Sequence, residues 1–333
     1  MKPLLVSIII PTYNRAHILG KTLDSIVAQT YAHWECIVVD DGSEDQTAQL
    51  MEHYCKSDAR FTFVTRPDNH KPGGNGARNY GLEIAKGDVI NWFDSDDLMH
   101  PNKLSAQLQV LSKNNALQIC ICSGKRVNPN THSEKPLRQN FSEDLFVQVA
   151  QNSSEIITNA FIVKKTFVAQ HQLRFEEELH RGQETDFLLQ ICKVIETHEI
   201  GYTEQHLFSY IFTEDSKSKK DKQYNSNFKW SRAKIYLDML SMSKTEAYKE
   251  IFKTRLRRII RIFFSALQHN DLHTSGYILK RLDLVLGNSF RMFRKQLSWV
   301  ATVNRFFPLP TDKLRTYFQN KAMKVLEDFD FNR

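Results

Sequence analysis

The sequence predicts an α/β protein in which helices flank a mainly parallel sheet and an α-helical region follows at the C-terminal end. Three observations predict this class. Short apolar runs alternate with helical periodicity along residues 4–124. The helical segments between those runs are long enough for right-handed crossovers between parallel strands. From residue 226 onward the periodicity is helical only. With 333 residues, of which 41% are hydrophobic, the chain can bury a sizeable core.

Five apolar runs predict the strands of the first part of the chain. They are LLVSIII at 4–10, WECIVVDD at 34–41, FTFVTRP at 61–67, DVINWF at 88–93 and LQICICSG at 117–124. Segments with apolar residues at helical spacing separate them, at 17–30, 43–56, 76–87 and 103–114. Strand and helix therefore alternate, as in a parallel sheet with helices on its faces.

The later segments are less regular. Residues 124–150 are polar and include two prolines, which predicts a loop over the sheet. Strand character returns at 154–165, and an amphipathic helix follows at 182–196. The charged segment 213–227 lacks large aliphatic side chains, so it is expected to be a mobile linker or lid. Five helices are predicted after it, at about 226–242, 244–268, 270–286, 288–304 and 311–328.

Charge and composition separate the chain into an acidic first part and a basic last part. Residues 217–333 hold 25 Lys and Arg against 10 Asp and Glu, a net charge of +15, whereas the whole chain carries +7. We expect a sheet domain at 1–215 and a basic helical region at 216–333. No apolar run approaches the roughly 18 residues of a membrane-spanning helix. The five cysteines are scattered without metal-type spacing, which favours packing roles and a reducing, cytoplasmic location.

Polar residues mark the exits of three predicted strands. In a parallel sheet, ligands bind beyond the carboxyl ends of the strands. We therefore expect one site to gather the following residues: Pro11, Thr12, Tyr13, Asn14 and Arg15 after the first strand, Asp40, Asp41, Gly42 and Ser43 after the second, and Asp94, Ser95, Asp96 and Asp97 after the fourth.

The acids at this edge predict a divalent cation. Asp94 and Asp96 repel each other unless a cation or a donor-rich ligand compensates their charge. Oxygen ligands without His or Cys favour Mg²⁺ or Mn²⁺, and these ions complete their shells with water and phosphates. This chemistry indicates a nucleotide diphosphate. Arg78, in the glycine-rich GGNGARN at 73–79, can meet a phosphate or pair with Asp97. Trp92 is expected in the core or against a sugar, and His70 is expected to be an exposed loop histidine.

Four segments in this order resemble the family 2 glycosyltransferases of the GT-A fold. They are VSIIIPTYNR, IVVDDGSEDQT, GARNYGLEIAKGD and INWFDSDD. The resemblance covers residues 4–110 and, less closely, 155–215, and no motif of the C-terminal third matches. It implies a Rossmann-like GT-A sheet domain with a nucleotide-sugar half at 1–110 and an acceptor half at 111–215.

The resemblance also implies residue roles. Asp40 would contact the nucleotide base, with Thr12 and Asn14 near base and ribose. Asp94 would lie near the ribose and the metal, and Asp96 would be a direct metal ligand. The family places a base in a GEDxDL pattern where this chain reads GQETDF, so Glu184 becomes the candidate general base and Asp186 the alternative. Both could equally be solvated acids of a first helical turn. The family often has a His as a third metal ligand, and Thr213 occupies the matching position here. Glu214 or Asp215 could take that role instead.

By resemblance the chain is a hexosyl- or N-acetylhexosaminyl-transferase that inverts the anomeric carbon. The donor would be a nucleotide-diphosphate sugar, with a UDP-sugar favoured by Asp40, and the acceptor a glycan or lipid-linked glycan. Cell-surface polysaccharide or lipopolysaccharide synthesis is the expected setting. Two alternatives stay open: a nucleotidyltransferase, although PTYNR lacks the glycine-rich loop of that class, and an inactive sugar-nucleotide-binding relative, because Glu184 and Thr213 depart from the family pattern.

The basic C-terminal helices allow two interpretations. KTRLRRIIRIFFSAL and FRMFRKQLSWVATVNRFF mix cations with large apolar residues. They can form a helical bundle whose long cationic side chains reach outward, and this is the favoured interpretation. They can also lie on the inner face of the cytoplasmic membrane as a peripheral contact. Nucleic acid is not expected as a partner, because no reader motif accompanies the charge.

Overall fold

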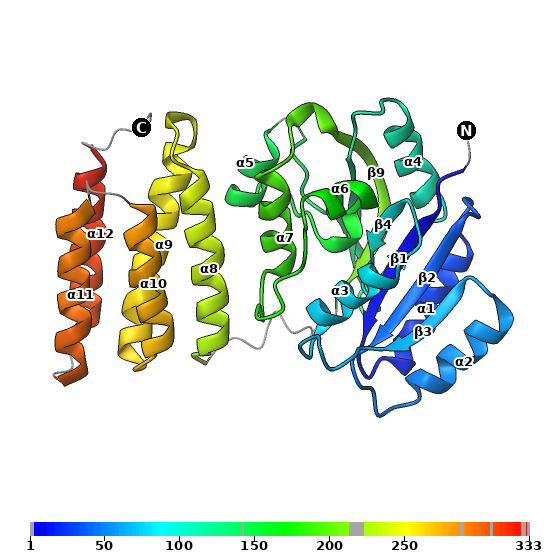
Figure 1. Ribbon diagram of the computed structural model, residues 1–333, viewed down its shortest axis with the longest axis horizontal. Helices are drawn as coiled ribbons and strands as arrows, with labels where there is room; N and C mark the ends of the chain where they lie inside the picture. Colours follow the sequence, from blue (N-terminus) through cyan, green and yellow to red (C-terminus); the bar gives the residue numbers. More distant parts are fainter. Residues whose placement is uncertain are drawn as a thin grey trace. The chain divides into compact units, whose positions relative to one another are not determined.

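The structure, a computed structural model, describes residues 3–141, 143–212, 223–286, 290–306, 309–327 and 331. The chain forms two compact units (Figure 1). The first comprises Met1–Glu178 and Gln183–Lys219, and the second comprises Leu179–Gly182 and Lys220–Arg333.

A parallel sheet forms the beginning of the first unit, as predicted. Its strands lie in the order β3-β2-β1-β4. The strands are β1 (Val6–Thr12), β2 (Trp34–Asp40), β3 (Phe61–Thr65) and β4 (Val89–Trp92). The helices between and after them are α1 (Ala16–Val27), α2 (Thr47–Ser57), α3 (Gly74–Ile84) and α4 (Lys103–Ser112). Every strand residue of β4 is buried, because the sheet continues on both sides of it.

The second half of the sheet differs from the expected series. The strand predicted at 117–124 is β6 (Ile119–Asn128), but β8 (Phe161–Lys164) lies between it and β4. β8 runs antiparallel to both neighbours, whereas β9 (Ile200–Ile211) pairs with β6 in parallel. The sheet is therefore mixed at this end. The segment predicted as a loop also holds regular structure. It contains the end of β6, its partner β7 (Ser133–Pro136) and α5 (Leu145–Gln151). The remaining elements of the unit are β5 (Leu98–Met99), α6 (Lys165–Gln170) and α7 (Gln183–Cys192).

Trp92 belongs to an aromatic cluster in the core. Its side chain is fully buried, and its ring centroid lies 4.9 Å from Phe187 and 5.3 Å from Phe175. Phe175 and Phe187 stack on each other at 4.4 Å. Of the two expectations for Trp92, core packing is confirmed. The cluster joins β4 to α7, the helix that carries Glu184 and Asp186.

The buried side chain of Lys103 forms a hydrogen bond with Asn91 of strand β4. Lys103 is completely buried, and its Nζ donates to Asn91 Oδ1 at 3.0 Å and Gln107 Oε1 at 2.7 Å. Gln107 donates in turn to the carbonyls of Cys120 and Ala160, and Asn91 donates to that of Phe161. Burial lowers the pKa of Lys103 from 10.5 to about 8.

This lowered pKa predicts a pH-dependent contribution to stability. The folded state holds its proton less tightly than the unfolded state, so stability is present above pH 10.5 and is lost as the pH falls through about 8. We expect the free energy of unfolding of the wild type to rise by about 2 kcal/mol relative to Lys103→Met between about pH 7 and pH 9.5. Urea unfolding of both proteins at the two pH values measures this. If the difference in unfolding free energy between the wild type and Lys103→Met did not change with pH, the lowered pKa of Lys103 would be wrong.

The second unit is a helical bundle, which confirms the favoured interpretation of the basic C-terminal region. Its helices are α8 (Ser226–Met242), α9 (Lys249–Gln268), α10 (Leu272–Val285), α11 (Arg291–Phe306) and α12 (Thr311–Glu327). They enclose an apolar core of their own, which includes Leu237, Phe252, Phe263 and Leu297. Among the described residues, no helix is both long and apolar enough to cross a membrane.

Candidate active site

The carboxyl ends of β1, β2 and β4 lie next to one another at one edge of the sheet. Thr12 is in register with Asp40, and the Asp41 N–H donates to the Thr12 carbonyl at 2.9 Å. On the other side, Trp92 is in register with Ile9, and the Phe93 N–H donates to the Ile9 carbonyl at 2.9 Å. The sheet thus brings together the three polar segments that the sequence marked.

The loops after β1 and β2 are tied to each other by Ser43. Asp40 accepts from the Ser43 N–H at 2.9 Å and from the Ser43 hydroxyl. The Asn14 N–H donates to Ser43 Oγ at 2.8 Å, and Asn14 Oδ1 accepts from the Glu44 N–H at 2.8 Å. Asn14 adopts a left-handed backbone conformation with φ of 52°, which asparagine tolerates better than most residues. These hydrogen bonds fix the Asp40 side chain at the carboxyl end of β2.

Thr12 ends β1 at this edge of the sheet, in register with Asp40. It is buried, and within the described part of the chain Thr12 Oγ1 has no hydrogen-bond partner. A buried polar atom without a partner is costly in a folded protein, so a ligand group that pairs with it gains binding energy. Beside it Pro11 is half-buried and Tyr13 is 53% exposed. Gly42, in the next loop, has φ of 91°, a conformation that side chains disfavour.

Asp41 has a structural role in these bonds. Its carboxylate accepts from Arg66 Nε and, at 2.7 Å, from the Gly73 N–H. It thereby joins the end of β2 to the glycine-rich turn that starts α3. Both oxygens of Asp41 have donors from other loops, whereas both oxygens of Asp40 have donors from Ser43 alone.

Asp94 is held from three directions. Arg78 Nη2 donates to Oδ1 at 2.7 Å, and the Thr158 hydroxyl donates to Oδ2 at 3.2 Å. The Asp94 N–H donates to Asn159 Oδ1 at 2.8 Å. Arg78 was expected to meet a phosphate or Asp97. The structure pairs it with Asp94 in place of Asp97, and the phosphate contact stays a prediction. Its guanidinium is nearly buried, and its Nε has no partner among the described residues.

Asp97 joins the acidic loop, residues 94–97, to Asn159 and to strand β9. It is fully buried and accepts from Asn159 Nδ2 and, at 2.7 Å, from the Ile211 N–H of β9. Burial, with the charges of Asp94 and Asp96, raises the pKa of Asp97 well above its usual range. The Thr22 hydroxyl also donates to the Asp97 and Ser95 carbonyls. Asp97 and Ser95 therefore fix the loop that presents Asp94 and Asp96.

Asp96 is the more accessible of the two proposed metal ligands. Its side chain is 38% exposed and forms an ion pair with Arg15 at 3.2 Å. Within the described residues, no group of three or more His, Cys, Asp or Glu side chains gathers as a metal site. Asp96 supplies the hard carboxylate oxygen that Mg²⁺ and Mn²⁺ prefer, and such ions often keep several water and phosphate ligands. The residues fit an ion held mainly by Asp96, with Asp94 beside it.

The two candidate bases on α7 lie in different surroundings. Glu184 is half-buried, and burial raises the pKa of its carboxyl above 4.5; nearby Arg78 opposes the increase and Asp94 adds to it. Glu184 is thus within electrostatic reach of the Asp94–Arg78 pair. Asp186 is buried and accepts from Gln190 Nε2 at 2.9 Å. Neither is a fully solvated first-turn acid, and Glu184 interacts electrostatically with Arg78 and Asp94.

Several residues of the site carry no sequence signal. Thr158 and Asn159, in a short 3-10 helix, hold Asp94 and Asp97. Tyr210 of β9 precedes Ile211, whose N–H donates to Asp97, and its pKa is raised by burial and by the charges of Asp97 and Asp96. The Arg126 guanidinium lies 5.8 Å from the centre of the Tyr210 ring. Only the general strand character of 154–165 hinted at the first two.

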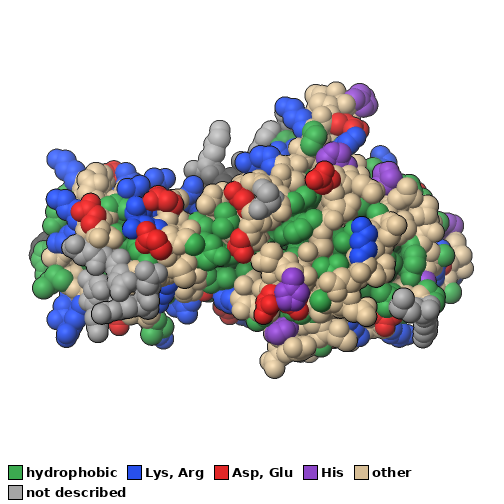
Figure 2. All heavy atoms as spheres, turned by 90° about the horizontal axis from the view of Figure 1, so that it is seen from above, with side chains coloured by type: hydrophobic (Ala, Val, Ile, Leu, Met, Phe, Trp, Pro, Cys, Tyr) green, Lys and Arg blue, Asp and Glu red, His purple; other side chains and the backbone are tan. Residues whose placement is uncertain are grey.

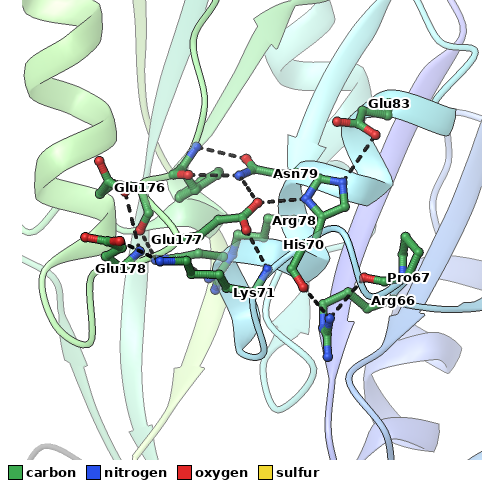
Figure 3. A network of polar contacts seen from close by, with 12 residues as sticks. Arg66, Pro67, His70, Lys71, Arg78, Asn79, Glu83, Glu176, Glu177 and Glu178 are labelled. Atoms are coloured by element: carbon green, nitrogen blue, oxygen red, sulfur yellow. Dashed lines mark hydrogen bonds and ion pairs between the residues drawn. The ribbon is translucent and has the colours of Figure 1, made fainter.

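His70 is not the exposed loop histidine that the sequence suggested. It is buried, and its ring nitrogens lie 2.7 Å from Glu177 Oε1 and 3.3 Å from Glu83 Oε2 (Figure 3). Burial alone would lower its pKa, but the two carboxylates outweigh it and raise the pKa. Glu177 also accepts from the Lys71 N–H at 2.7 Å and from Asn79 Nδ2 at 2.9 Å. This network fixes the turn before α3 against residues 174–178. The candidate third metal ligands Glu214 and Asp215 lie outside the described residues, as does Thr213 at the position where the family often has His.

Comparisons with known proteins agree with this geometry. The family model Glycosyl transferase family 2 matches residues 7–171. The chain is 41% identical over 115 residues to UDP-Glc:alpha-D-GlcNAc-diphosphoundecaprenol beta-1,3-glucosyltransferase WfgD of Escherichia coli, which covers 34% of this chain and 44% of that protein. It is 30% identical over 203 residues to the uncharacterized glycosyltransferase RT0329 of Rickettsia typhi, covering 59% and 62%. The chain therefore spans about half the length of these curated relatives.

Solved structures show the same fold. The structure of S. aureus TarS 1-349 in complex with UDP-GlcNAc superposes with a TM-score of 0.64 and 17% identity. The alignment covers 96% of this chain and 92% of that one. The likeness therefore extends through the C-terminal helices, for which the sequence offered no motif.

Proposed function

The chain belongs to glycosyl transferase family 2 through its residues 7–171, and on that premise we propose that it transfers a sugar from a nucleotide-diphosphate sugar to a hydroxyl group with inversion. The acceptor is a glycan or a lipid-linked glycan, and the transferred group is a hexosyl or N-acetylhexosaminyl unit. One observation supports the proposal: the neighbouring carboxyl ends of β1, β2 and β4 bring Asp40 and the loop of Asp94 and Asp96 to one edge of the sheet.

The donor is proposed to be a UDP-sugar. WfgD is named for UDP-Glc, and the TarS structure contains UDP-GlcNAc. Here Asp40 can accept from the N–H of a base such as uracil, and the unpartnered Thr12 hydroxyl can bond a base or ribose oxygen. Arg15 can attract the diphosphate once Asp96 has another partner.

Glu184 acts as the general base in the proposed mechanism. Its carboxylate takes the proton of the acceptor hydroxyl while that oxygen attacks the anomeric carbon and the bond to the diphosphate breaks. Its raised pKa makes it a stronger base than an ordinary glutamate. Arg78 and Thr158 keep Asp94 in place beside the sugar. Mn²⁺ or Mg²⁺, bound at Asp96 with Asp94 nearby, would neutralise charge on the departing diphosphate.

The biological setting follows from the relatives and the acceptor class. We propose that the enzyme works in the cytoplasm in the synthesis of a cell-surface polysaccharide or lipopolysaccharide. A lipid-linked acceptor would bring it to the membrane, which suits a peripheral contact through the basic helices.

Donor binding is the first test. We expect UDP with Mn²⁺ to raise the Tm of the full chain, and GDP or dTDP with Mn²⁺ to raise it less. The reason is that the nucleotide supplies partners for the Thr12 hydroxyl and Asp40, and ligands of the native state stabilise it by mass action. If GDP raised the Tm as much as UDP does, the donor would no longer be assigned as a UDP-sugar. No shift with any nucleotide diphosphate would favour an inactive relative and contradict the proposed function.

The stereochemistry of the product is the second test. A base on the acceptor side and a separate leaving group predict direct in-line displacement. Nuclear magnetic resonance of the product is expected to show an anomeric configuration opposite to that of the donor. Retention of the donor configuration would exclude Glu184 as a base of single displacement.

A further inference from the structure

Helix α11 carries two apolar faces, and the bundle uses one of them. Phe293, Leu297 and Val300 are buried in the core of the second unit. Met292, Trp299 and Phe306 are 67%, 65% and 73% exposed. A helix of a helical bundle normally needs one apolar stripe, so the second one calls for a separate partner.

The exposed apolar residues form a line along the helix. They follow one another at intervals of seven residues, which brings them to nearly the same side of an α-helix. From Met292 to Phe306 the line extends about 21 Å. Lys295 and Thr302 are exposed between them. We refer to Met292, Lys295, Trp299, Thr302 and Phe306 as the α11 face.

The charged residues of helix α11 itself are all positive, while Asp283 of the neighbouring α10 lies close to it. Helix α11 contains Arg and Lys but no acidic residue. Arg291, Lys295 and Arg305 are exposed, whereas Arg294 is bonded to Asp283 of α10. Figure 2 shows Lys and Arg side chains on the C-terminal helices, at the left of the view, with some Asp and Glu side chains between them. The helix thus combines exposed aromatic and thioether side chains with cations only.

We propose that the α11 face docks on the surface of an anionic lipid bilayer. Met292, Trp299 and Phe306 enter the boundary between headgroups and acyl chains, a region that tryptophan favours. Arg291, Lys295 and Arg305 meet the anionic headgroups. This surface belongs to the second unit alone, and the inference stands apart from the reaction proposed for the first.

Charge complementarity favours lipid over the other occupants. A second copy paired through the same face would bring its cations against those of the first, with no acid on α11 to compensate. Nucleic acid would satisfy the cations but leave Met292, Trp299 and Phe306 without an apolar surface to enter. An anionic membrane satisfies both the charge and the apolar line.

The experiment is sedimentation of the full chain with vesicles. One set contains phosphatidylcholine only, and the other contains about one third phosphatidylglycerol. We expect binding to the anionic vesicles, weak binding to the neutral ones, and release by salt. Trp299 is exposed, Trp230 is half-buried, and Trp34 and Trp92 are buried, so insertion of Trp299 should shift the tryptophan emission to the blue. Trp299→Phe should retain binding but lose this shift.

Matched variants separate the α11 face from general surface properties. The double substitution Met292→Ser and Trp299→Ser is expected to lower the partition coefficient of the protein into anionic vesicles by about tenfold. Leu272→Ser with Tyr317→Ser, which also removes two exposed apolar residues of this unit, should leave it unchanged. Likewise, Arg291→Gln, Lys295→Gln and Arg305→Gln together should weaken binding more than Lys280→Gln, Lys313→Gln and Lys324→Gln. These six cations are all exposed.

Three outcomes would overturn the proposal. The first is no binding to either vesicle type by a folded wild-type chain. The second is equal loss of binding in the α11 variants and in their matched controls. The third is a wild-type dimer in gel filtration that the Met292 and Trp299 substitutions convert to a monomer, because a second copy would then be the occupant. None of these results depends on transferase activity, so they would remove the peripheral membrane contact but leave the proposed sugar transfer untouched.

Discussion

Replacement of Glu184 by Gln is expected to lower the kcat of sugar transfer by about a thousandfold, because a positioned general base contributes on the order of 10²–10⁴ to the rate. Glutamine keeps the size of the side chain but cannot take the proton of the acceptor hydroxyl. The Kd of the donor should stay within about twofold, since the base acts on the acceptor. Single-turnover transfer and donor titration with the same preparation measure the two quantities.

Asp186→Asn is the matched control for this substitution. Asp186 also lies in the first turn of α7, but its buried carboxylate accepts from Gln190, and an amide oxygen can accept the same bond. We expect Asp186→Asn to keep kcat within about tenfold of the wild type. The opposite ranking, with Asp186→Asn inactive and Glu184→Gln active, would transfer the role of base to Asp186.

The pH profile provides a further readout of Glu184. A general base works when deprotonated, so kcat is lost as the pH falls through its pKa. Because burial raises the pKa of Glu184 above 4.5, the loss should begin at a higher pH than for an exposed glutamate. The residual activity of Glu184→Gln should lack this acid limb.

Removal of the metal ligand is the second large effect that we expect. Asp96→Asn should lower kcat/KM for the donor by about a hundredfold in Mn²⁺, because metal-assisted charge stabilisation is worth several kcal/mol. Chelation of the wild type with EDTA should cause a loss of similar size. If Asp96 acts through the metal, EDTA should cost the Asp96→Asn variant little more, since the two changes remove one interaction.

The control for Asp96 is Asp68→Asn, which changes an exposed carboxylate elsewhere in the first unit. It should behave like the wild type with and without EDTA. Full activity of the wild type in EDTA, together with full activity of Asp96→Asn, would show that the reaction needs neither the ion nor this carboxylate. Equal loss in both aspartate variants would indicate a nonspecific effect of charge.

Much of the fold could be predicted because its signals are local. The strands from β1 to β4 appear as apolar runs, and the helices of the second unit differ from their predicted limits by a few residues. Periodicity depends only on neighbours in the chain, so it reveals an element before the fold is known. The order of the strands is different in kind. β8 enters between β4 and β6 through a connection that no periodic pattern describes.

The candidate site divides in the same way. The sequence located Asp40, Asp94 and Asp96 because strand ends in a parallel sheet share one edge. It could not assign their partners. Asp97 bonds the backbone of Ile211, 114 residues away, and Asn159 bonds Asp94 from 65 residues away.

The sequence by itself thus determined which residues stand at the ends of the strands and which helices have apolar stripes. Tertiary structure decided that Arg78 pairs with Asp94, that Asp186 accepts a hydrogen bond from Gln190, and that α11 buries Phe293 while exposing Trp299. The physical reason is that periodicity is a property of adjacent residues, whereas a hydrogen bond or a buried face depends on what the rest of the chain brings against it.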